Sequence, residues 1–273
     1  MRTVFAVYGD PIEHSLSPNM HNAAFKELGM DCTYHAYRVK PARLRDTLLR
    51  AQAMGFGGVN LTVPLKQEAL KIVDADPLAT AIGAVNTVDF KDGMRGYNTD
   101  GIGAKRCIEE EGVQISGSNV LIVGAGGASR AIAFQFAKDG ANITIANRTE
   151  EKALELAEEV SDVGNAKGCG LDDLRGLIAD SDILINCTTL GMHPNVESTI
   201  ATAEDMHPKL TVFDIVYNPL ETRLLKEAKK AGAKAVPGVM MLVYQGAEAF
   251  KIWTGMEPPI YVMKKAVLEG LKS

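Results

Sequence analysis

Two residues of this sequence, Lys66 and Asp100, are of types that move protons, and each lies among compact polar side chains. Lysine is cationic at neutral pH and can donate a proton to an oxygen that gains negative charge, and a nearby carboxylate favours that cationic form. Reduction of a ketone needs such a donor, because hydride transfer leaves an alkoxide. The pair therefore predicts proton transfer to or from a substrate oxygen. It leaves open which of the two residues is the general base when the reaction runs in the direction of alcohol oxidation. Taken alone, Asp100 is also explained as a helix cap.

Further polar side chains stand at the ends of expected elements in the first hundred residues. Ser15 and Ser17 lie where a helix begins. A cap at Ser17 explains one of them, and the two together suit a carboxylate ligand. In the stretch NLTVPLK the period of two places Asn60 and Thr62 on one face of a strand, where they need hydrogen-bond partners. The proline ends that strand, so Lys66 falls in the first turn of the next helix.

A third candidate site is a glycine-rich loop. The strand expected over Asn119–Val123 runs into the sequence GAGGAS, which opens a helix expected to end at Lys138. Glycines in such a loop let backbone N–H groups approach a phosphate, and the helix N-terminus adds a partial positive charge. The motif is weak by itself, since Ser129 stands where the usual fingerprint has its third glycine or alanine. An ordinary tight turn between strand and helix is the alternative.

The segment after the next expected strand, Asn142–Ala146, bears on the choice of dinucleotide. NAD sites usually have an acidic residue about 20 residues after the glycine-rich motif, and this acid binds the ribose 2′-hydroxyl. Here the residues are Asn147, Arg148 and Thr149, with no acid. A guanidinium and a hydroxyl suit a 2′-phosphate, which a carboxylate would repel. The sequence therefore favours NADP, with Lys152 as a further donor, and solvated surface residues are the alternative for Arg148 and Lys152.

These residues need a framework of alternating strands and helices, which the hydrophobic pattern predicts almost from end to end. In the first half we expect strands over 3–8, 33–39, 58–63 and 84–90, and helices over 17–28, 41–54 and 65–73. In the second half we expect strands over 119–123, 142–146, 183–186 and 211–215, and helices over 127–138, 150–160 and 222–231. Two helices, over 239–254 and 261–272, follow. The prediction is an α/β fold with largely parallel strands in two closely joined units, and the last helices can pack on either.

The composition excludes several classes of protein. The chain has 273 residues, of which 46% are hydrophobic, enough for one large core or two modest ones. A formal net charge of −5 gives no general attraction to nucleic acid. No run approaches the roughly 18 apolar residues of a membrane span. The four cysteines form no CxxC pair and the five histidines no HExxH motif, so we expect free thiols, a cytoplasmic location and no metal site.

The motifs together resemble those of the shikimate dehydrogenase family, in the same order and over nearly the whole chain. The matching segments are SLSPNMHN at 15–22, NLTVPLK at 60–66, GAVNT at 83–87, NTDG at 98–101, GAGGASRA at 124–131, NRTEEK at 147–152, NCTTLGM at 186–192, YNPLET at 217–222 and PGVMMLVYQG at 237–246. Jointly they are far more specific than any one of them. The resemblance implies reversible, NADPH-dependent reduction of 3-dehydroshikimate to shikimate, in aromatic amino-acid and chorismate biosynthesis.

The resemblance also implies a role for each site residue. Lys66 and Asp100 are the catalytic pair. Ser15 and Ser17 hold the substrate carboxylate, with Tyr217 nearby. The residues that hold the ring hydroxyls and carbonyl are Asn60, Thr62, Asn86, Asp100 and Gln245. The cofactor-binding residues are Gly124, Ala125, Gly126, Gly127, Ala128, Asn147, Arg148, Thr149, Lys152, Thr188, Ile215, Gly238 and Met241. Met241 lies beside the nicotinamide, and because Met241 and Gln245 are i, i+4, one helix face serves both ligands.

At the level of domains, the resemblance assigns residues 1–102 and 238–273 to a discontinuous substrate-binding domain with a mostly parallel sheet. It assigns residues 103–237 to a Rossmann-like, doubly wound NADP-binding domain. The expected partner is the small-molecule substrate, with neither nucleic acid nor membrane, and the expected state is a monomer or homodimer.

Two alternatives remain open from the sequence. A quinate or dual quinate/shikimate dehydrogenase of the same superfamily often takes NAD, and Arg148 with the missing acid argues against it. A non-catalytic NADP-binding sensor would be expected to lose the ionisable pair, and both Lys66 and Asp100 are present.

Overall fold

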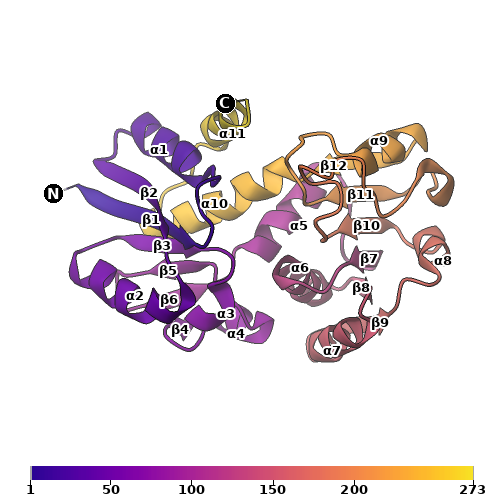
Figure 1. Ribbon diagram of the computed structural model, residues 1–273, viewed down its shortest axis with the longest axis horizontal. Coiled ribbons are helices and arrows are strands. Elements are labelled where there is room, and N and C mark those ends of the chain that lie inside the picture. The colour runs from indigo at the N-terminus through magenta and orange to yellow at the C-terminus, as the bar shows by residue number, and fades with distance from the viewer. Residues whose placement is uncertain (1, 273) are drawn as a thin grey trace. The chain divides into compact units, whose positions relative to one another are not determined.

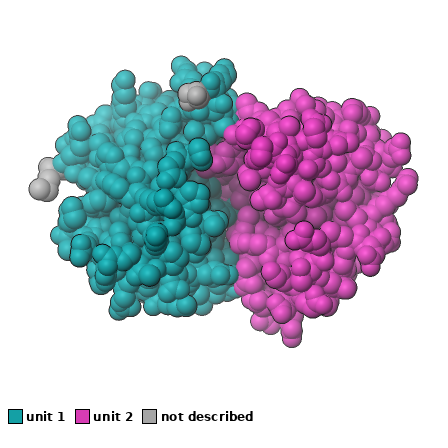
Figure 2. All heavy atoms as spheres, in the orientation of Figure 1, with its two compact units in different colours: residues 1–100, 243–273 teal, residues 101–242 magenta. Residues whose placement is uncertain are grey.

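The computed structural model describes residues 2–272, which divide into two compact units, coloured separately in Figure 2. Unit 1 contains the chain up to Asp100 and again from Val243 onward, and unit 2 contains Gly101–Leu242. Each unit has its own six-stranded sheet. The chain passes between the units within two helices, α5 (Asp100–Glu110) and α10 (Val239–Thr254), labelled in Figure 1. Among the helices of the described part of the chain, none is long and apolar enough to cross a bilayer.

Unit 1 has a mixed sheet with the strand order β2-β1-β3-β5-β6-β4. Its strands are β1 (Thr3–Gly9), β2 (Cys32–Arg38), β3 (Gly58–Leu61), β4 (Asp74–Ala75), β5 (Thr87–Asp89) and β6 (Arg95–Tyr97). Strand β1 lies between β2 and β3 and is parallel to both, whereas β5 is antiparallel to its neighbours β3 and β6. Because β1, β2 and β3 are parallel, the segments that follow them leave the sheet at one edge, which we call the carboxyl edge.

Helices cover both faces of the unit 1 sheet (Figure 1). The helices of unit 1 are α1 (Ser17–Glu27), the 3₁₀ turn η1 (Pro41–Arg43), α2 (Leu44–Ala53), α3 (Lys66–Ala69), α4 (Pro77–Ile82), part of α10, and α11 (Ile260–Gly270), which packs on α1. Successive side chains of β1 enter different cores, as the period of two requires. Ala6 and Tyr8 join a buried cluster with residues of α2. The Phe5 ring packs against Phe25 of α1 and Trp253 of α10, at centroid distances of 5.3 and 5.0 Å.

Unit 2 has a fully parallel sheet with the order β12-β11-β10-β7-β8-β9. Its strands are β7 (Asn119–Val123), β8 (Asn142–Ala146), β9 (Asn165–Cys169), β10 (Ile183–Asn186), β11 (Thr211–Asp214) and β12 (Lys234–Pro237). Its helices, besides parts of α5 and α10, are α6 (Gly127–Lys138), α7 (Glu150–Ser161), α8 (Leu174–Ala179), the 3₁₀ turn η2 (Ala203–Asp205) and α9 (Arg223–Lys230). Read from β9, this is the doubly wound order 3-2-1-4-5-6, which reverses between β7 and β10. Ligands of such sheets bind where the order reverses.

The predicted α/β class is confirmed, and several buried strands were predicted to the residue. The expected strands over 119–123, 142–146 and 183–186 coincide with β7, β8 and β10. The helix expected over 65–73 is shorter, because α3 ends at Ala69. The sequence pattern predicts neither the short β4 and β6, the edge strands β9 and β12, nor the helices α4 and α8. The strands β4 and β6 have only two and three residues, too few to show a period. The edge strands β9 and β12 contain a glycine and a proline, which edge positions tolerate but which weaken the strand pattern.

The prediction that Ser17 caps the first helix is wrong. Helix α1 begins at Ser17 itself, its N-cap is Leu16, and no side chain makes a capping hydrogen bond. Pro18 lies in the first turn, where its fixed φ favours a helix start. The Ser17 hydroxyl is therefore not used to cap the helix.

Candidate active site

Lys66 and Asp100 form the centre of the candidate active site in unit 1. Lys66 is the first residue of α3, and Asp100 is the first residue of α5. The Lys66 Nζ donates a hydrogen bond to Asp100 Oδ2 at 2.5 Å, and the two side chains are 21% and 9% exposed. This bond is charge-assisted and largely removed from water, which strengthens it. The structure thus brings a proton donor and its counter-ion together.

The rest of Asp100 is held by other side chains. Its Oδ1 accepts a hydrogen bond from Asn86 Nδ2 at 2.9 Å, and its backbone N–H donates to Asn98 Oδ1 at 3.1 Å. Asn98 in turn donates to the Ala84 carbonyl at 3.0 Å. Because each carboxylate oxygen bonds a side chain, a helix-capping role does not account for Asp100.

Asn60 of β3 connects this pair to the interior of the sheet. Its Oδ1 accepts from the Tyr34 hydroxyl at 2.7 Å, and its Nδ2 donates to the Asn86 carbonyl at 3.1 Å and to Thr87 Oγ1 at 3.0 Å. The Thr87 hydroxyl donates to Asn86 Oδ1 at 2.9 Å. These four residues are buried, so their polar groups satisfy one another where water does not reach. Sequence reasoning gave no role to Tyr34 or Thr87. Thr87 is a polar residue in a mostly buried strand, whereas Tyr34 is the one buried residue of the mostly exposed edge strand β2.

The remaining candidate substrate residues of the first segment lie at the carboxyl edge of the same sheet. Ser15 and Ser17 follow β1, and Ser17 is buried while Ser15 is half-buried. A side-chain hydrogen bond links Ser17 to Tyr34. Thr62 follows β3, and its backbone N–H donates to the Tyr8 carbonyl at 2.9 Å. Unit 1 therefore places these side chains on segments that leave neighbouring parallel strands.

Two further candidate substrate residues come from the second half of the chain. Gln245 is half-buried on α10, in the part of that helix that belongs to unit 1. Tyr217 belongs to unit 2, in the segment after β11, and burial raises the pKa of its phenol. Unit 1 thus contains every candidate substrate residue except Tyr217.

The glycine loop of unit 2 follows β7. Gly124 has a φ of +113°, and a Cβ built there would lie 3.0 Å from the Cys187 carbonyl oxygen. Backbone and packing therefore both require glycine at this position. A Cβ at Gly126 or Gly127 would meet no protein atom within 4 Å, so neither glycine is required by packing. Ser129, in place of the third glycine, is buried and donates its hydroxyl to the Gly124 carbonyl, which closes the turn.

The helix that follows has an open N-terminus. Helix α6 is 12 residues long, its N-cap is Gly126, and no side chain caps it. Its first backbone N–H groups therefore point out of the helix without a side-chain acceptor, as anion-binding helix ends do. Thr188 lies after β10, on the other side of the point where the strand order reverses. Its backbone N–H and its hydroxyl both donate to Asn186 Oδ1, at 3.1 and 2.7 Å.

The turn after β8 presents the candidate 2′-phosphate residues. Asn147 Nδ2 donates to the Thr149 carbonyl at 2.8 Å, which fixes the turn. Arg148, Thr149 and Lys152 are exposed, and Thr149 is the N-cap of α7 without a capping side-chain bond. The first turn of α7 also contains two acids, Glu150 and Glu151. Arg148 is thus available at the surface of an ordered turn.

Asp214, which the sequence analysis did not single out, organises two loops of unit 2. This carboxylate is fully buried at the end of β11 and accepts from Asn186 Nδ2 at 2.9 Å and Thr222 Oγ1 at 2.6 Å. Burial raises its pKa in spite of these bonds. A Cβ at Gly238 would lie 2.5 Å from the carbonyl oxygens of Asp214 and Ile215, so packing alone requires that glycine. The signal for Asp214 was an acid at the end of an otherwise apolar strand.

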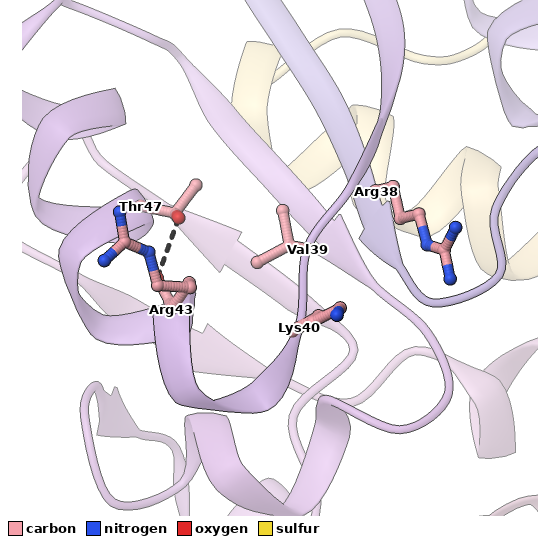
Figure 3. Close-up of a pocket in the computed structure, with 5 residues that line it drawn as sticks. All are labelled: Arg38, Val39, Lys40, Arg43 and Thr47. Atoms are coloured by element: carbon pink, nitrogen blue, oxygen red, sulfur yellow. Dashed lines mark hydrogen bonds between the residues drawn. The ribbon is translucent and has the colours of Figure 1, made fainter.

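A separate hollow of about 470 Å³ lies at the end of β2 in unit 1 (Figure 3). It is lined by Arg38, Val39, Lys40, Arg43 and Thr47. Arg38 Nε donates to Asp10 Oδ1 at 2.5 Å, while the Thr47 hydroxyl donates to the Arg43 carbonyl at 2.7 Å. The hollow contains no predicted site residue, and its lining is cationic.

Within residues 2–272, no three His, Cys, Asp or Glu side chains form a group that could hold a metal ion.

A doubly wound unit with a glycine loop at its switch point, in one chain with an α/β unit that holds a partly buried lysine–aspartate pair, defines a dinucleotide-dependent dehydrogenase. The particular family follows from comparison with known proteins: the chain belongs to the shikimate dehydrogenase family. Residues 7–88 match the shikimate dehydrogenase substrate binding domain, residues 105–221 match shikimate/quinate 5-dehydrogenase, and residues 238–268 match the shikimate 5′-dehydrogenase C-terminal domain.

Individual relatives agree with this assignment. The chain is 63% identical to the shikimate dehydrogenase (NADP+) of Methanosarcina barkeri, over 100% of both sequences. A crystal structure of a shikimate dehydrogenase in complex with NADP+ matches with a TM-score of 0.92 at 48% identity, covering 99% of this chain and 96% of that one. The Thermus thermophilus enzyme in complex with NADP(H) and shikimate matches with a TM-score of 0.89 at 38% identity, covering 98% and 99%. The family resemblance predicted from the motifs is confirmed.

Proposed function

We propose that the protein catalyses the reversible, NADPH-dependent reduction of 3-dehydroshikimate to shikimate. The observation that carries this proposal is the shielded bond between Lys66 Nζ and Asp100 Oδ2 at 2.5 Å, in a family whose curated members are named shikimate dehydrogenase (NADP+). A non-catalytic sensor of NADP has no use for such a pair. Residues 1–102 and 238–273 are the proposed substrate domain, and residues 103–237 the proposed cofactor domain.

The chain's own residues fit NADP in unit 2. The open space over Gly126 and Gly127 and the uncapped N-terminus of α6 suit a pyrophosphate, and Arg148 with Thr149 suits a 2′-phosphate. The other proposed contacts are Gly124, Ala125, Ala128, Asn147, Lys152, Thr188, Ile215, Gly238 and Met241. When bound, NADPH supplies the hydride that reduces the ketone.

Lys66 and Asp100 handle the proton. During reduction the ketone oxygen becomes an alkoxide, and the Lys66 ammonium donates a hydrogen bond and then a proton to it. The Asp100 carboxylate stabilises the ammonium form and fixes its position by accepting at Oδ2. In the oxidation of shikimate the same pair takes up the proton that the substrate hydroxyl releases.

The polar side chains at the carboxyl edge recognise the substrate. Ser15 and Ser17 hold its carboxylate, with Tyr217, and the ring oxygens are held by Asn60, Thr62, Asn86, Asp100 and Gln245. Asn60 already donates both of its amide hydrogens to Asn86 and Thr87, so it can only accept from a substrate hydroxyl. A site with such fixed polarity discriminates against analogues that lack the hydroxyl.

The test is absorbance at the nicotinamide band with purified protein, comparing kcat/KM for shikimate and quinate, each with NADP and NAD. We expect the highest kcat/KM for shikimate with NADP. A higher value for quinate or for NAD would instead support a quinate or dual-specificity dehydrogenase. Binding of NADP without shikimate-dependent reduction would overturn the proposal in favour of a sensor.

The cytoplasmic location, the monomeric or homodimeric state, and the absence of nucleic-acid and membrane partners remain predictions. The net charge of −5 supports only the expectation about nucleic acid. Sedimentation velocity of the purified chain distinguishes a monomer of 273 residues from its dimer.

A further inference from the structure

The buried polar residues of unit 1 form one directed series of hydrogen bonds that ends on Asp100. The Tyr34 hydroxyl donates to Asn60 Oδ1, and Asn60 Nδ2 donates to Thr87 Oγ1. The Thr87 hydroxyl donates to Asn86 Oδ1, and Asn86 Nδ2 donates to Asp100 Oδ1. Every bond points the same way, with donor–acceptor distances between 2.7 and 3.0 Å. Hydrogen bonds arranged in series in a low dielectric polarise and strengthen one another.

The remote end of the series is rigid. The backbone of Tyr34 exchanges two hydrogen bonds of 2.8 Å with the Asn22 side chain. Its ring stacks on His21, with centroids 4.4 Å apart and planes 9° from parallel. Burial raises the pKa of the Tyr34 phenol well above its usual value of 10, so the hydroxyl stays a donor. Tyr34 is therefore a fixed anchor.

The middle of the series depends on one strand pair. Asn60 and Thr87 are directly opposite each other in the antiparallel pair β3–β5, which brings their side chains together. The threonine hydroxyl accepts from one amide and donates to the next, which an apolar side chain of the same shape cannot do. Thr99 supports Asn86 from the other side, since its backbone N–H donates to Asn86 Oδ1 at 2.9 Å and its hydroxyl accepts from Nδ2 at 3.0 Å. Loss of the Thr87 hydroxyl therefore loosens the Asn86 amide without removing every contact.

We propose that Tyr34 and Thr87 are positioning residues, which act through Asn60 and Asn86 to hold the Asp100 carboxylate in the orientation that receives the Lys66 ammonium. This inference rests on the proposed function, because it assumes that Asp100 takes part in proton transfer. Neither residue needs to touch substrate. Their effect is on the rate of the chemical step, because misplacing a catalytic group by about 1 Å is sufficient to cost roughly a hundredfold.

The central test compares Thr87→Val with Thr87→Ser in the whole enzyme. We expect Thr87→Val to lower kcat about tenfold or more with KM for NADP unchanged, and Thr87→Ser, which keeps the hydroxyl, to restore kcat to within about twofold. Tyr34→Phe should also lower kcat, and because the Tyr34 hydroxyl is hydrogen-bonded to Ser17 it should raise KM for shikimate as well. Tyr8→Phe is the matched control, because Tyr8 is buried in the same sheet and takes no part in the series. We expect it to leave kcat unchanged, and Tm is measured for all four variants.

The second test places the same substitutions in an Asp100→Asn background. If Thr87 acts through Asp100, Thr87→Val causes no further loss there, whereas an independent structural effect multiplies with the first. Multiplying effects, or an equal loss of kcat in Tyr8→Phe, would overturn the inference. A large loss of kcat in Asp100→Asn with no loss in Thr87→Val would overturn the positioning inference and leave the proposed function standing. Near-normal kcat in Asp100→Asn would show that Asp100 is not needed for proton transfer, which overturns this inference while the dehydrogenase activity itself stands.

Discussion

At the scale of single residues, the sharpest prediction concerns the Lys66 ammonium. Lys66→Ala removes the proton donor, so kcat should fall by about 10²–10⁴-fold while KM for NADP changes little. Steady-state kinetics with shikimate and NADP measure both constants. Lys71→Ala is the control, because Lys71 is exposed and forms a surface ion pair with Glu68. Near-normal kcat in Lys66→Ala would show that another group transfers the proton.

A second prediction at this scale concerns the preference for NADP. Arg148→Ala should raise KM for NADP by roughly tenfold and leave KM for NAD nearly unchanged, because only NADP has the 2′-phosphate that the guanidinium suits. Arg175→Ala removes another exposed arginine of unit 2 and serves as the control. An equal rise of KM for both cofactors would mean that Arg148 does not read the phosphate.

Single residues also show where sequence reasoning stops. Lys66 and Asp100 were identifiable by residue type and motif, and the structure places their charged atoms in contact. Tyr34 and Thr87 were not identifiable, because their partners are set by strand register. Asn60 meets Thr87 only through the antiparallel pairing of β3 with β5, which the hydrophobic pattern of either segment leaves undefined. The chemistry of the candidate site could thus be predicted from the sequence, whereas the hydrogen bonds that support it could not.

At the scale of elements, the glycine loop between β7 and α6 separates two reasons for glycine. Gly124→Ala should lower the free energy of unfolding by about 1–3 kcal/mol, because φ at this position is +113°. Gly126→Ala should leave stability nearly unchanged, since φ is −91° and a Cβ meets open space, yet raise KM for NADP. Urea denaturation and kinetics of the two variants give this comparison. Unchanged cofactor affinity in Gly126→Ala would argue against a pyrophosphate at this loop.

The segment from β2 to α2 supports a further prediction. Arg38, Lys40 and Arg43 surround the hollow at the end of β2, on the carboxyl edge where the proposed anionic substrate binds. The charge-reversed double variant of Lys40→Glu with Arg43→Glu should lower kcat/KM for shikimate at low salt and leave kcat unchanged. Matched reversals at Lys26 and Lys91, which lie toward the opposite edge, are the control. The difference in kcat/KM between the variant and the natural chain should vanish near 1 M salt, where the Debye length is about 3 Å. A loss that persists at this salt concentration would contradict electrostatic attraction of the substrate by these cations.

Elements were predicted best where most of the side chains are buried. β7, β8 and β10 are mostly apolar runs in the middle of a parallel sheet, and their bounds follow from the sequence. β9 reads NAKGC and β12 reads KAVP, and both are edge strands. An edge strand is defined by its neighbour's free hydrogen-bonding groups more than by its own side chains, so its sequence contains little signal.

At the scale of the whole molecule, the chain passes twice between its two units, and only part of this was predictable. The two α/β halves follow from the order of strands and helices. The place of the last helices does not follow from the hydrophobic pattern, because α10 is apolar on most sides and its periodicity does not indicate which sheet it packs on. Only the family resemblance assigned these helices to the substrate domain. In the structure its residues from Val243 onward belong to unit 1, and those up to Leu242 belong to unit 2. The contacts that decide this, such as Phe5 with Trp253, join residues distant in sequence.

Stability of the molecule against acid should depend on one buried imidazole. His21 is fully buried among Tyr34, Phe25 and Phe250, and neither of its ring nitrogens has a hydrogen-bond partner among the described residues. Burial lowers its pKa from 6.5 to about 3. Between these values the unfolded chain binds a proton that the folded protein does not. The free energy of unfolding therefore falls as pH falls through this window, by about 1.4 kcal/mol for each pH unit.

His21→Phe keeps an aromatic ring against Tyr34 and removes the titrating group, so it should lose that part of the pH dependence. Urea denaturation at pH 7 and pH 4.5 measures the change, and the stability of the variant relative to the natural chain should increase at the lower pH. His14→Gln is the control, because His14 is an exposed histidine of the same unit. Equal slopes for His21→Phe and the natural chain would mean that the folded protein admits the proton, for which the ring would need an acceptor or water at its nitrogens.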